Sequence, residues 1–317
     1  MPADIPMLAD IRAAADRIAG KVLRTPVLPA RGGLNELTGS TLYFKAENLQ
    51  RAGAFKFRGA CNALAQLDAN QRQAGVITHS SGNHAAALAL AGQLFDVPVQ
   101  VVMPKTASEV KVAAVQSYGG RIHFCEPTQQ AREERLADLS QSTGAHFVPP
   151  YDDWRIICGQ GTAALELVED QPDLDVVIAP VGGGGLLSGT AIAVKGHSPD
   201  IAVIGAEPVL AGDAHLSFVT GRLHPQMPPR SIADGLLTAL SERTFEIIRR
   251  HVDAIQTVSE IDIVRAMRLI GERLKLVVEP SAAVPLALVL SAPAQFAGRR
   301  VGIILSGGNL DLQRWRW

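Results

Sequence analysis

An alternation of short apolar segments with longer helical segments is the feature that most constrains how this chain folds. It begins at residue 75 and runs to residue 206, and one more apolar segment follows near the C-terminus. Strands that alternate with helices of about ten to fifteen residues form βαβ units, whose strands run parallel. The sequence therefore predicts an α/β fold built on parallel sheets.

The expected elements follow from hydrophobic periodicity and from the turn residues between them. Strands are expected at residues 41–46, 75–79, 97–103, 121–125, 145–148, 175–181, 201–206 and 300–305. Helices are expected at residues 4–19, 55–67, 83–95, 107–118, 129–143, 159–169, 185–195, 241–250, 260–273 and 281–290. Residues 208–234 contain Pro225, Pro228 and Pro229, so this stretch is expected to be irregular.

Residues 75–148 contain a complete run of alternating elements, and residues 149–153, which begin with two prolines, are the expected connector out of it. Apolar residues make up 47% of the chain, enough for a sizeable core. We therefore expect two α/β domains. The small domain takes residues 71–151, and the large domain combines residues 1–70 with residues 152–317.

Charge and cysteine content exclude several classes of protein. Lys and Arg number 30 against 31 Asp and Glu, and a net charge of −1 does not suit binding to nucleic acid or to an anionic membrane. Cys61, Cys125 and Cys158 lie far apart without a CxxC spacing, which argues against a zinc site and a disulfide framework. Neither a signal peptide nor an apolar run of about 18 residues is found. We expect a cytoplasmic protein.

Lys56 lies between Phe55 and Phe57, in the first turn of the expected helix 55–67. Apolar neighbours disfavour the charged form of an amine and so lower its pKa. Free N–H groups at a helix start act in the same direction. Lys56 is therefore a candidate for the neutral amine that forms a Schiff base with an aldehyde cofactor. The alternative is a lysine that extends past two aromatic rings into solvent.

Gly182, Gly183, Gly184 and Gly185 follow an apolar strand directly and open a helix. Successive glycines let the backbone turn several N–H groups toward one point, which makes an anion site at a helix start. The spacing fits neither the GxGxxG dinucleotide motif nor the P-loop. The loop therefore predicts a site for a single phosphate, and a tight strand-to-helix turn is the alternative.

Ser80, Ser81, Gly82, Asn83 and His84 occupy the corresponding position after an earlier strand. Ligands of open α/β sheets bind at the carboxyl ends of strands. Hydroxyl, amide and helix-start N–H groups thus converge on an expected carboxylate site, unless the polar residues serve only as helix caps. A similar run, Ser306 to Asn309, follows the last strand.

Glu207, Ala211 and Asp213 surround a loop after the expected strand 201–206. Two carboxylates and one backbone carbonyl are suitable ligands for a hard cation such as Mg²⁺ or Ca²⁺. Acidic loops are more often simply solvated, so the spacing leaves both interpretations open. The terminal residues Arg314 to Trp317 are either an interface element or aromatic residues packed on the surface.

Four stretches occur together in one order, and the combination is much more specific than any one of them. They are Phe55–Ala60, Ser80–His84, Gly182–Gly185 and Ser306–Asn309. The chain resembles the serine/threonine dehydratase and serine racemase branch of the fold-type II pyridoxal-phosphate (PLP) enzymes, which are similar to the tryptophan synthase β chain. The resemblance covers nearly the whole sequence, up to Glu279-Pro280. It implies two parallel-sheet domains with the cofactor in the cleft between them.

The resemblance also implies roles for individual residues. Lys56 is implied to be the Schiff-base lysine and Phe55 to pack against the cofactor ring. Asn83 is implied to hydrogen-bond the ring oxygen, and Gly182 to Gly185 to hold the phosphate. Ser306 is implied to meet the pyridine nitrogen with a neutral hydroxyl, which suits β-elimination.

Further implied roles concern the substrate, the cofactor and the cation. Residues 80–84 are the implied substrate loop, and Ser81 is implied to face the substrate opposite Lys56, where racemases of this branch keep a second acid/base. Gly235 is implied to belong to the cofactor site. The run from Glu207 to Asp213 is similar to the divalent-cation site of racemase-like members, with Mg²⁺, Ca²⁺ or Mn²⁺ as the ion.

Three departures from the family pattern leave the substrate preference open. Ala54 stands where the family usually has serine, Ala86 where it commonly has glutamine, and residues 151–153 replace an asparagine-containing loop of the animal racemases. No regulatory extension follows residue 317, so we expect none of the feedback control of long threonine deaminases.

We therefore expect PLP-dependent dehydration and deamination of a β-hydroxy amino acid to a 2-oxo acid and ammonia. Serine, threonine, 3-hydroxyaspartate and a bulkier β-hydroxy amino acid are the candidate substrates, and the family suggests a homodimer. Racemisation as the main activity is one alternative. A β-replacement enzyme of the cysteine-synthase kind is another, although such enzymes usually have threonine where His84 stands. A catalytically silent protein that binds a phosphate ligand is the alternative from a different class.

Overall fold

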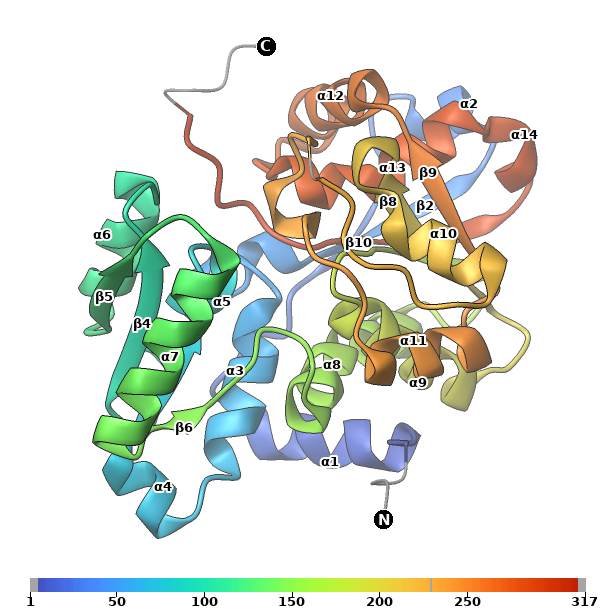
Figure 1. Ribbon diagram of the computed structural model, residues 1–317. Coiled ribbons are helices and arrows are strands. Elements are labelled where there is room, and N and C mark those ends of the chain that lie inside the picture. Colours follow the sequence, from blue (N-terminus) through green and yellow to red (C-terminus); the bar gives the residue numbers. More distant parts are fainter. Residues whose placement is uncertain (1–4, 229, 313–317) are drawn as a thin grey trace.

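The computed structural model describes residues 5–228 and 230–312, and the residues 314–317 discussed above lie outside this range. Two separate sheets organise the chain (Figure 1). The larger sheet has the strand order β1-β2-β10-β7-β8-β9. Its strands are β1 (Val27–Pro29), β2 (Thr41–Ala46), β7 (Val176–Pro180), β8 (Ala202–Pro208), β9 (Ala254–Val258) and β10 (Arg300–Leu305). Only β1 pairs antiparallel with its neighbour; the remaining pairs are parallel.

The smaller sheet has the order β5-β4-β3-β6, and all its pairs are parallel. Its strands are β3 (Val76–His79), β4 (Val99–Pro104), β5 (Arg121–Cys125) and β6 (His146–Phe147). They come from one continuous segment, whereas the larger sheet takes strands from both sides of that segment. The predicted α/β class with parallel sheets is confirmed. The domain boundaries at residues 71 and 151 stay predictions.

Helices cover both faces of the larger sheet, with α8, α9 and α11 on one side and α12 and α13 on the other (Figure 1). Strand β7 shows why: Val177 and Ala179 face the first group, while Val176 and Ile178 face the second. A parallel sheet buried on both faces needs such a continuously apolar strand. The helices are α1 (Leu8–Ile18), α2 (Leu34–Thr38), α3 (Lys56–Ala65), α4 (Ala69–Ala74), α5 (Asn83–Phe95), α6 (Glu109–Ser117), α7 (Gln129–Thr143), α8 (Trp154–Asp170), α9 (Gly185–His197), α10 (Asp213–Thr220), α11 (Glu242–His251), α12 (Glu260–Leu269), α13 (Pro280–Ser291) and α14 (Pro293–Phe296).

Two expectations about the elements were wrong. Residues 208–234 are not irregular throughout, because α10 forms there and ends at Gly221, whose φ of 69° is left-handed, before the prolines begin. Helix α8 begins at Trp154, five residues earlier than expected, since the Asp153 side chain accepts a hydrogen bond from the Arg155 N–H at 2.7 Å and caps the helix. None of the described helices combines the length and the hydropathy needed to cross a membrane.

Candidate active site

Lys56 is the first residue of α3 and is half-buried. Its Nζ donates a hydrogen bond to the Pro150 carbonyl at 2.7 Å and lies 5.2 Å from the centroid of the Phe55 ring. Burial lowers the pKa of Lys56 to about 8, and the charge of Glu279 opposes this shift. Phe57 does not flank the amine but packs into the core. A usable fraction of Lys56 is therefore in the expected neutral form near pH 7, with one aromatic ring, that of Phe55, beside the amine.

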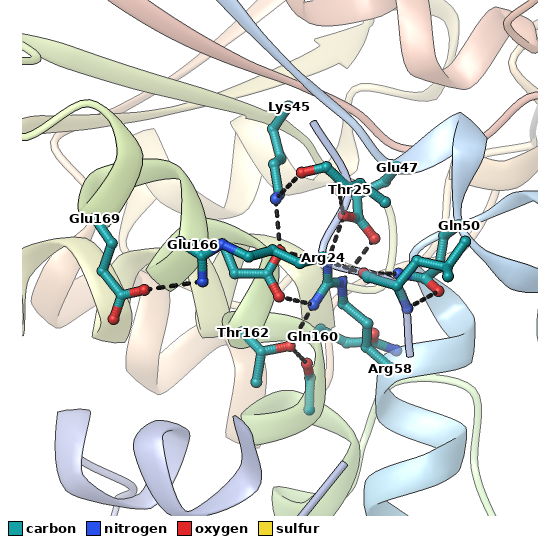
Figure 2. A network of polar contacts seen from close by, with 12 residues as sticks. Arg24, Thr25, Lys45, Glu47, Gln50, Arg58, Gln160, Thr162, Glu166 and Glu169 are labelled. Atoms are coloured by element: carbon teal, nitrogen blue, oxygen red, sulfur yellow. Dashed lines mark hydrogen bonds and ion pairs between the residues drawn. The ribbon is translucent and has the colours of Figure 1, made fainter. Parts of the chain in front are cut away.

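A buried ion network fixes the helix that carries Lys56 (Figure 2). Arg58, two residues further along α3, is fully buried. Its guanidinium donates to both carboxylate oxygens of Glu47 at 2.7 and 2.8 Å and to both of Glu166 at 2.7 and 2.8 Å. Thr162 accepts a further bond at 3.1 Å. Bidentate pairing of this kind fixes direction as well as charge, so α3 is tied to the end of β2 and to α8.

Lys45 of β2 completes the network, because its Nζ donates to Glu166 at 2.6 Å and to the Thr25 carbonyl at 2.6 Å. The positive charges of Lys45 and Arg58 therefore compensate the negative charges of Glu47 and Glu166 in the interior. The first turn of α3 cannot shift along its axis without breaking these bonds. Lys56 is held by the protein core.

Asn83, the first residue of α5, faces Glu279 at the start of α13. The Asn83 amide donates to the two carboxylate oxygens of Glu279 at 2.8 and 3.0 Å, and its own oxygen accepts from Asn309 at 2.9 Å. Glu279 is 5% exposed, and burial raises its pKa to about 7. These contacts join the helix that follows β3 of the smaller sheet to the larger sheet.

The end of β10 lies beside Lys56. The Phe55 N–H donates to the carbonyl of buried Ser306 at 3.0 Å, and Ala54 forms a bridge with Gly307. A Cβ on Gly307 would lie 2.6 Å from a carboxylate oxygen of Glu279, so a side chain there would displace that carboxylate. Lys56, Phe55 and Ser306 are therefore neighbours, as the resemblance implies.

The glycine loop is entirely buried and is packed too closely for side chains. Gly184 has a φ of 85°, and a Cβ on it would meet Leu240 at 2.7 Å. A Cβ on Gly183 would lie 2.4 Å from the Tyr151 ring. Within the described part of the chain, the N–H groups of residues 182–187 have no backbone acceptor. Buried N–H groups without partners are costly, which fits a loop that holds an anion.

Gly235 lies close to both parts of the site. Its N–H donates to the Ser281 hydroxyl at 3.0 Å, and a Cβ on it would come within 4.0 Å of Glu279. Its neighbour Leu236 contacts Gly182, because a Cβ on that glycine would lie 2.9 Å from the Leu236 Cα. The glycine loop and the Glu279 cluster are thus connected through residues 235 and 236.

The loop Ser80–His84 follows β3, with Ser81 half-buried and Gly82 open enough to meet no atom within 4 Å of an added Cβ. The Ser80 hydroxyl accepts from the Gly82 N–H at 3.2 Å. His84 is buried, and its Nε2 pairs with the Val148 carbonyl at 3.1 Å. Burial lowers the pKa of His84 to about 3, so this ring is neutral and carries no charge to the site.

Glu207 and Asp213 form a separate cluster at the end of β8 and the start of α10. The carboxylate of Glu207 accepts from the Ala214 and His215 N–H groups at 3.0 and 2.8 Å, and burial raises its pKa to about 8. Asp213 is buried, and its Oδ2 has no hydrogen-bond partner within the described residues. Residues 5–228 and 230–312 contain no group of three or more His, Cys, Asp or Glu side chains suited to a metal.

The sequence interpretation missed two parts of the site. The acceptor of Lys56 is a backbone carbonyl in the expected connector 149–153, a position that carries no side-chain signal. No role was predicted for Arg58, although a charged residue two positions after Lys56 in an apolar helix indicates a buried partner.

The arrangement suits an aldehyde cofactor with one phosphate. An amine with a lowered pKa, an aromatic ring beside it and a loop of unpaired buried N–H groups provide the contacts that PLP requires. Asn83 and Ser306 add polar groups from two other elements. These residues fit the cofactor that the resemblance implies.

Comparison with known proteins gives the same result. The family model described as "Pyridoxal-phosphate dependent enzyme" matches residues 18–307. The chain is 49% identical over 313 residues to a beta-hydroxyaspartate dehydratase from Paracoccus denitrificans, covering 99% of both chains. It is 46% identical to a serine racemase from Arabidopsis thaliana, covering 96% of this chain and 93% of that relative. The crystal structure of serine racemase from Dictyostelium discoideum matches with a TM-score of 0.93 and 44% identity, over 98% of this chain and all of that one.

These matches confirm the predicted fold type and the predicted enzyme class, the PLP-dependent lyases and racemases that act on β-hydroxy amino acids. PLP is the cofactor of that family. The chain therefore belongs to the family of pyridoxal-phosphate dependent enzymes.

Proposed function

We propose that this protein converts 3-hydroxyaspartate to oxaloacetate and ammonia, with Lys56 as the catalytic base. The observation that carries the proposal is the half-buried Lys56 amine, whose pKa of about 8 leaves a usable fraction neutral at physiological pH. A general base works best when its pKa lies near the operating pH. Lys56 removes the α-proton, the β-hydroxyl leaves as water, and hydrolysis of the product releases ammonia.

Residues of this chain would hold PLP at five points. Bound PLP supplies an aldehyde that condenses with amines and a ring that takes up the electron pair left by the α-proton. Gly182 to Gly185 would direct N–H groups at the phosphate, and Phe55 would lie against the ring. Asn83 would hold the ring oxygen and Ser306 the ring nitrogen, and Gly235 would border the same space.

Arg132 favours a substrate with a second carboxylate. It lies in the first turn of α7, and its Nε is buried without a hydrogen-bond partner among the described residues. Burial and, after it, the charge of Arg132 lower the pKa of His79, the residue directly before Ser80. Residues 80–84 would bind the α-carboxylate, while Arg132 binds the distal one. The relative named beta-hydroxyaspartate dehydratase supports this choice over serine or threonine.

Racemisation is a second candidate activity, because Ser81 lies in the loop that would face the substrate opposite Lys56. Several relatives of this chain, among them those from Arabidopsis thaliana and Dictyostelium discoideum, are named serine racemases. Ser81→Ala should abolish racemisation while elimination of at least one enantiomer survives. Unchanged racemisation would contradict the role given to Ser81.

Glu207, Asp213 and the Ala211 carbonyl would hold a divalent cation, with Mg²⁺ the first choice and Ca²⁺ or Mn²⁺ the alternatives. The unpaired Oδ2 of Asp213 beside a second buried carboxyl group supports this, since a cation would compensate both. We also propose a homodimer located in the cytoplasm. The three cysteines, all free and buried, are consistent with a reducing compartment.

The deciding experiment measures 2-oxo acid and ammonia release from both enantiomers of 3-hydroxyaspartate, serine and threonine, with and without Mg²⁺. Arg132→Met should lower kcat/KM for 3-hydroxyaspartate about ten- to a hundredfold relative to serine, the range expected for one charge-assisted hydrogen bond. Exposed Arg135 of the same helix gives the matched control, Arg135→Met. Equal losses on all substrates would contradict the role of Arg132, and product formation by Lys56→Ala would contradict the whole proposal.

A further inference from the structure

The segment of residues 148–153, which contains the connector, passes through the site and contacts Lys56, the substrate loop and the glycine loop. The Val148 carbonyl pairs with His84, and the Pro150 carbonyl accepts the hydrogen bond of Lys56. Asp152 accepts from the Ser241 hydroxyl at 2.8 Å and from Arg243 at 2.6 Å. The segment therefore does more than join two sheets, because it touches the lysine and the substrate loop.

Tyr151, in the middle of the connector, forms one wall of the glycine loop. An ideal Cβ on Gly183 would lie 2.4, 2.5 and 2.6 Å from three ring carbons of Tyr151. A Cβ on Gly185 would lie 2.9 Å from the Tyr151 Cβ. The ring thus lies directly on the backbone of Gly183, while the Cβ and backbone of Tyr151 lie against Gly185, and neither position leaves room for a side chain.

Tyr151 is itself held in place through the residue that follows it. Its neighbour Asp152 is tied to the start of α11, where Arg243 also donates to the Asp152 carbonyl at 2.7 Å. Arg243 lies 4.7 Å from the centroid of the Trp154 ring. An aromatic side chain has few rotatable bonds, so a Tyr151 ring fixed at its backbone is a rigid support.

A run of four glycines needs such a support. Glycine loses more conformational freedom on ordering than any other residue, so four in succession would not by themselves keep several N–H groups aimed at one point. The buried, unpaired N–H groups of residues 182–187 have no acceptor that would fix them in the described chain. Burial and the charges of Asp152 and Asp213 raise the pKa of Tyr151, so its phenol stays neutral beside an anion.

We propose that Tyr151 is the positioning residue of the phosphate site, holding residues 182–185 in the conformation that binds the cofactor phosphate. The inference rests on the proposed role of the glycine loop. It assigns to the ring, and not to the hydroxyl, the function of keeping the N–H groups directed at the phosphate. Preorganisation of this kind improves affinity by removing the cost of ordering the loop.

The test compares PLP with pyridoxal, which has the same ring and aldehyde but no phosphate. Equilibrium dissociation constants of both are measured for wild type, Tyr151→Ala, Tyr151→Leu and Tyr151→Phe, from the absorbance of bound cofactor. The ratio of the pyridoxal constant to the PLP constant should fall about tenfold in Tyr151→Ala, which corresponds to about 1.4 kcal/mol. Tyr151→Phe should keep the wild-type ratio. Tyr151→Leu introduces a bulky but flexible side chain, so its ratio should lie between those of wild type and Tyr151→Ala.

Tyr118→Ala is the matched control, since it removes a half-buried tyrosine at the end of α6. An unchanged ratio in Tyr151→Ala and Tyr151→Leu would overturn the inference while leaving the proposed function intact. An equal loss for both ligands would also overturn it, because Tyr151 would then support the fold in general. A wild-type protein that does not prefer PLP over pyridoxal would instead contradict the role of the glycine loop.

Discussion

Glu279 is buried and Lys56 half-buried, and the pKa values of these two ionisable residues approach one another in this site. Burial raises the pKa of Glu279 to about 7 and lowers that of Lys56 to about 8, and each charge stabilises the other. Asn83 binds the carboxylate form through both oxygens. The protonation state of a single side chain therefore affects both the base and the amide that would contact the cofactor.

Glu279→Gln should move the pKa of Lys56 further below 8. The Glu279 carboxylate favours the ammonium form of Lys56, so its removal leaves desolvation unopposed and favours the neutral amine. The midpoint of PLP binding against pH, followed by absorbance between pH 5 and 10, should shift to lower pH. Glu272→Gln, a change at an exposed residue, is the control. A midpoint that stays in place or rises would contradict the electrostatic link.

The same substitution should change how stability depends on pH. A carboxyl group whose pKa is higher in the folded than in the unfolded protein stabilises the fold below its unfolded pKa, and that contribution is lost as pH rises through about 7. Wild type should therefore lose more unfolding free energy between pH 5 and pH 8 than Glu279→Gln does. Urea titrations at the two pH values measure this, and parallel losses would contradict it.

Gly184→Ala should abolish tight PLP binding. Gly184 combines a left-handed φ of 85° with Leu240 and Thr244 within 2.9 Å of an added Cβ, so alanine strains the backbone and clashes. Gly20→Ala is a sharp control, because Gly20 has a similar φ of 74° but nothing within 4 Å. Denaturant unfolding and PLP titration should separate the two variants. If the two variants lost PLP affinity and stability to the same extent, the left-handed φ and not the clash with Leu240 and Thr244 would explain the effect.

At the scale of elements, the sequence predicted most strands and helices because their periodicity was undisturbed. The bounds of β2, β5, β10, α5 and α7 match the expected ones. Strand β9 was missed, since Gln256 and Thr257 interrupt its apolar pattern and its burial depends on β8. The start of α8 was misplaced because Gly159 and Gly161 suggest a helix end, whereas here they allow close contact with α3 and α9.

The candidate site was predicted less completely than the fold. Lys56, the glycine loop and Asn83 have local patterns that sequence alone reveals. Asn83 pairs with Glu279, and Lys56 pairs with the Pro150 carbonyl. Both partners come from elements far away in the chain. Such pairings depend on how the two sheets meet, and no local periodicity encodes that.

Arg58→Met should destabilise the fold by about 3–5 kcal/mol, the usual cost of breaking a buried ion pair. Glu166 would keep its ion pair with Lys45, whereas buried Glu47 would lose Arg58 and keep the hydrogen bond from Thr25. Arg268→Met removes an exposed i,i+4 partner of Glu272, which is worth less than about 1 kcal/mol. Guanidinium unfolding of the two variants gives the comparison, and equal destabilisation would mean that burial does not matter here.

At the scale of the whole molecule, an ion pair connects the two sheets at the surface. Lys111 of α6, beside the smaller sheet, donates to Asp234 at 2.5 Å, directly before Gly235 of the cofactor site. Both side chains are partly exposed, so salt screens the pair and its contribution to stability is small. Its position favours a role in holding the two sheets together around a bound substrate.

Lys111→Met should raise KM for the amino acid about threefold or more and change the unfolding free energy by less than about 1 kcal/mol. The rise should shrink at high salt, where the wild-type pair is screened as well. Lys105→Met is the control, because Lys105 pairs with Glu126 on the smaller sheet's side alone. Steady-state kinetics at two salt concentrations test this, and equal effects of both variants would exclude a role for the pair between the sheets.

The order of strands in the larger sheet has a consequence for synthesis of the protein. β2 ends at residue 46, but its parallel neighbour β10 begins only at residue 300. At about 5–20 residues per second, the ribosome needs on the order of 10–50 seconds between them. The smaller sheet can form during this time, while Leu42 and Phe44, fully buried in the finished molecule, stay exposed on the nascent chain. The edge of β2 that pairs with β10 therefore stays without its partner for most of the time that synthesis takes, the interval in which unpaired strand edges are prone to aggregation.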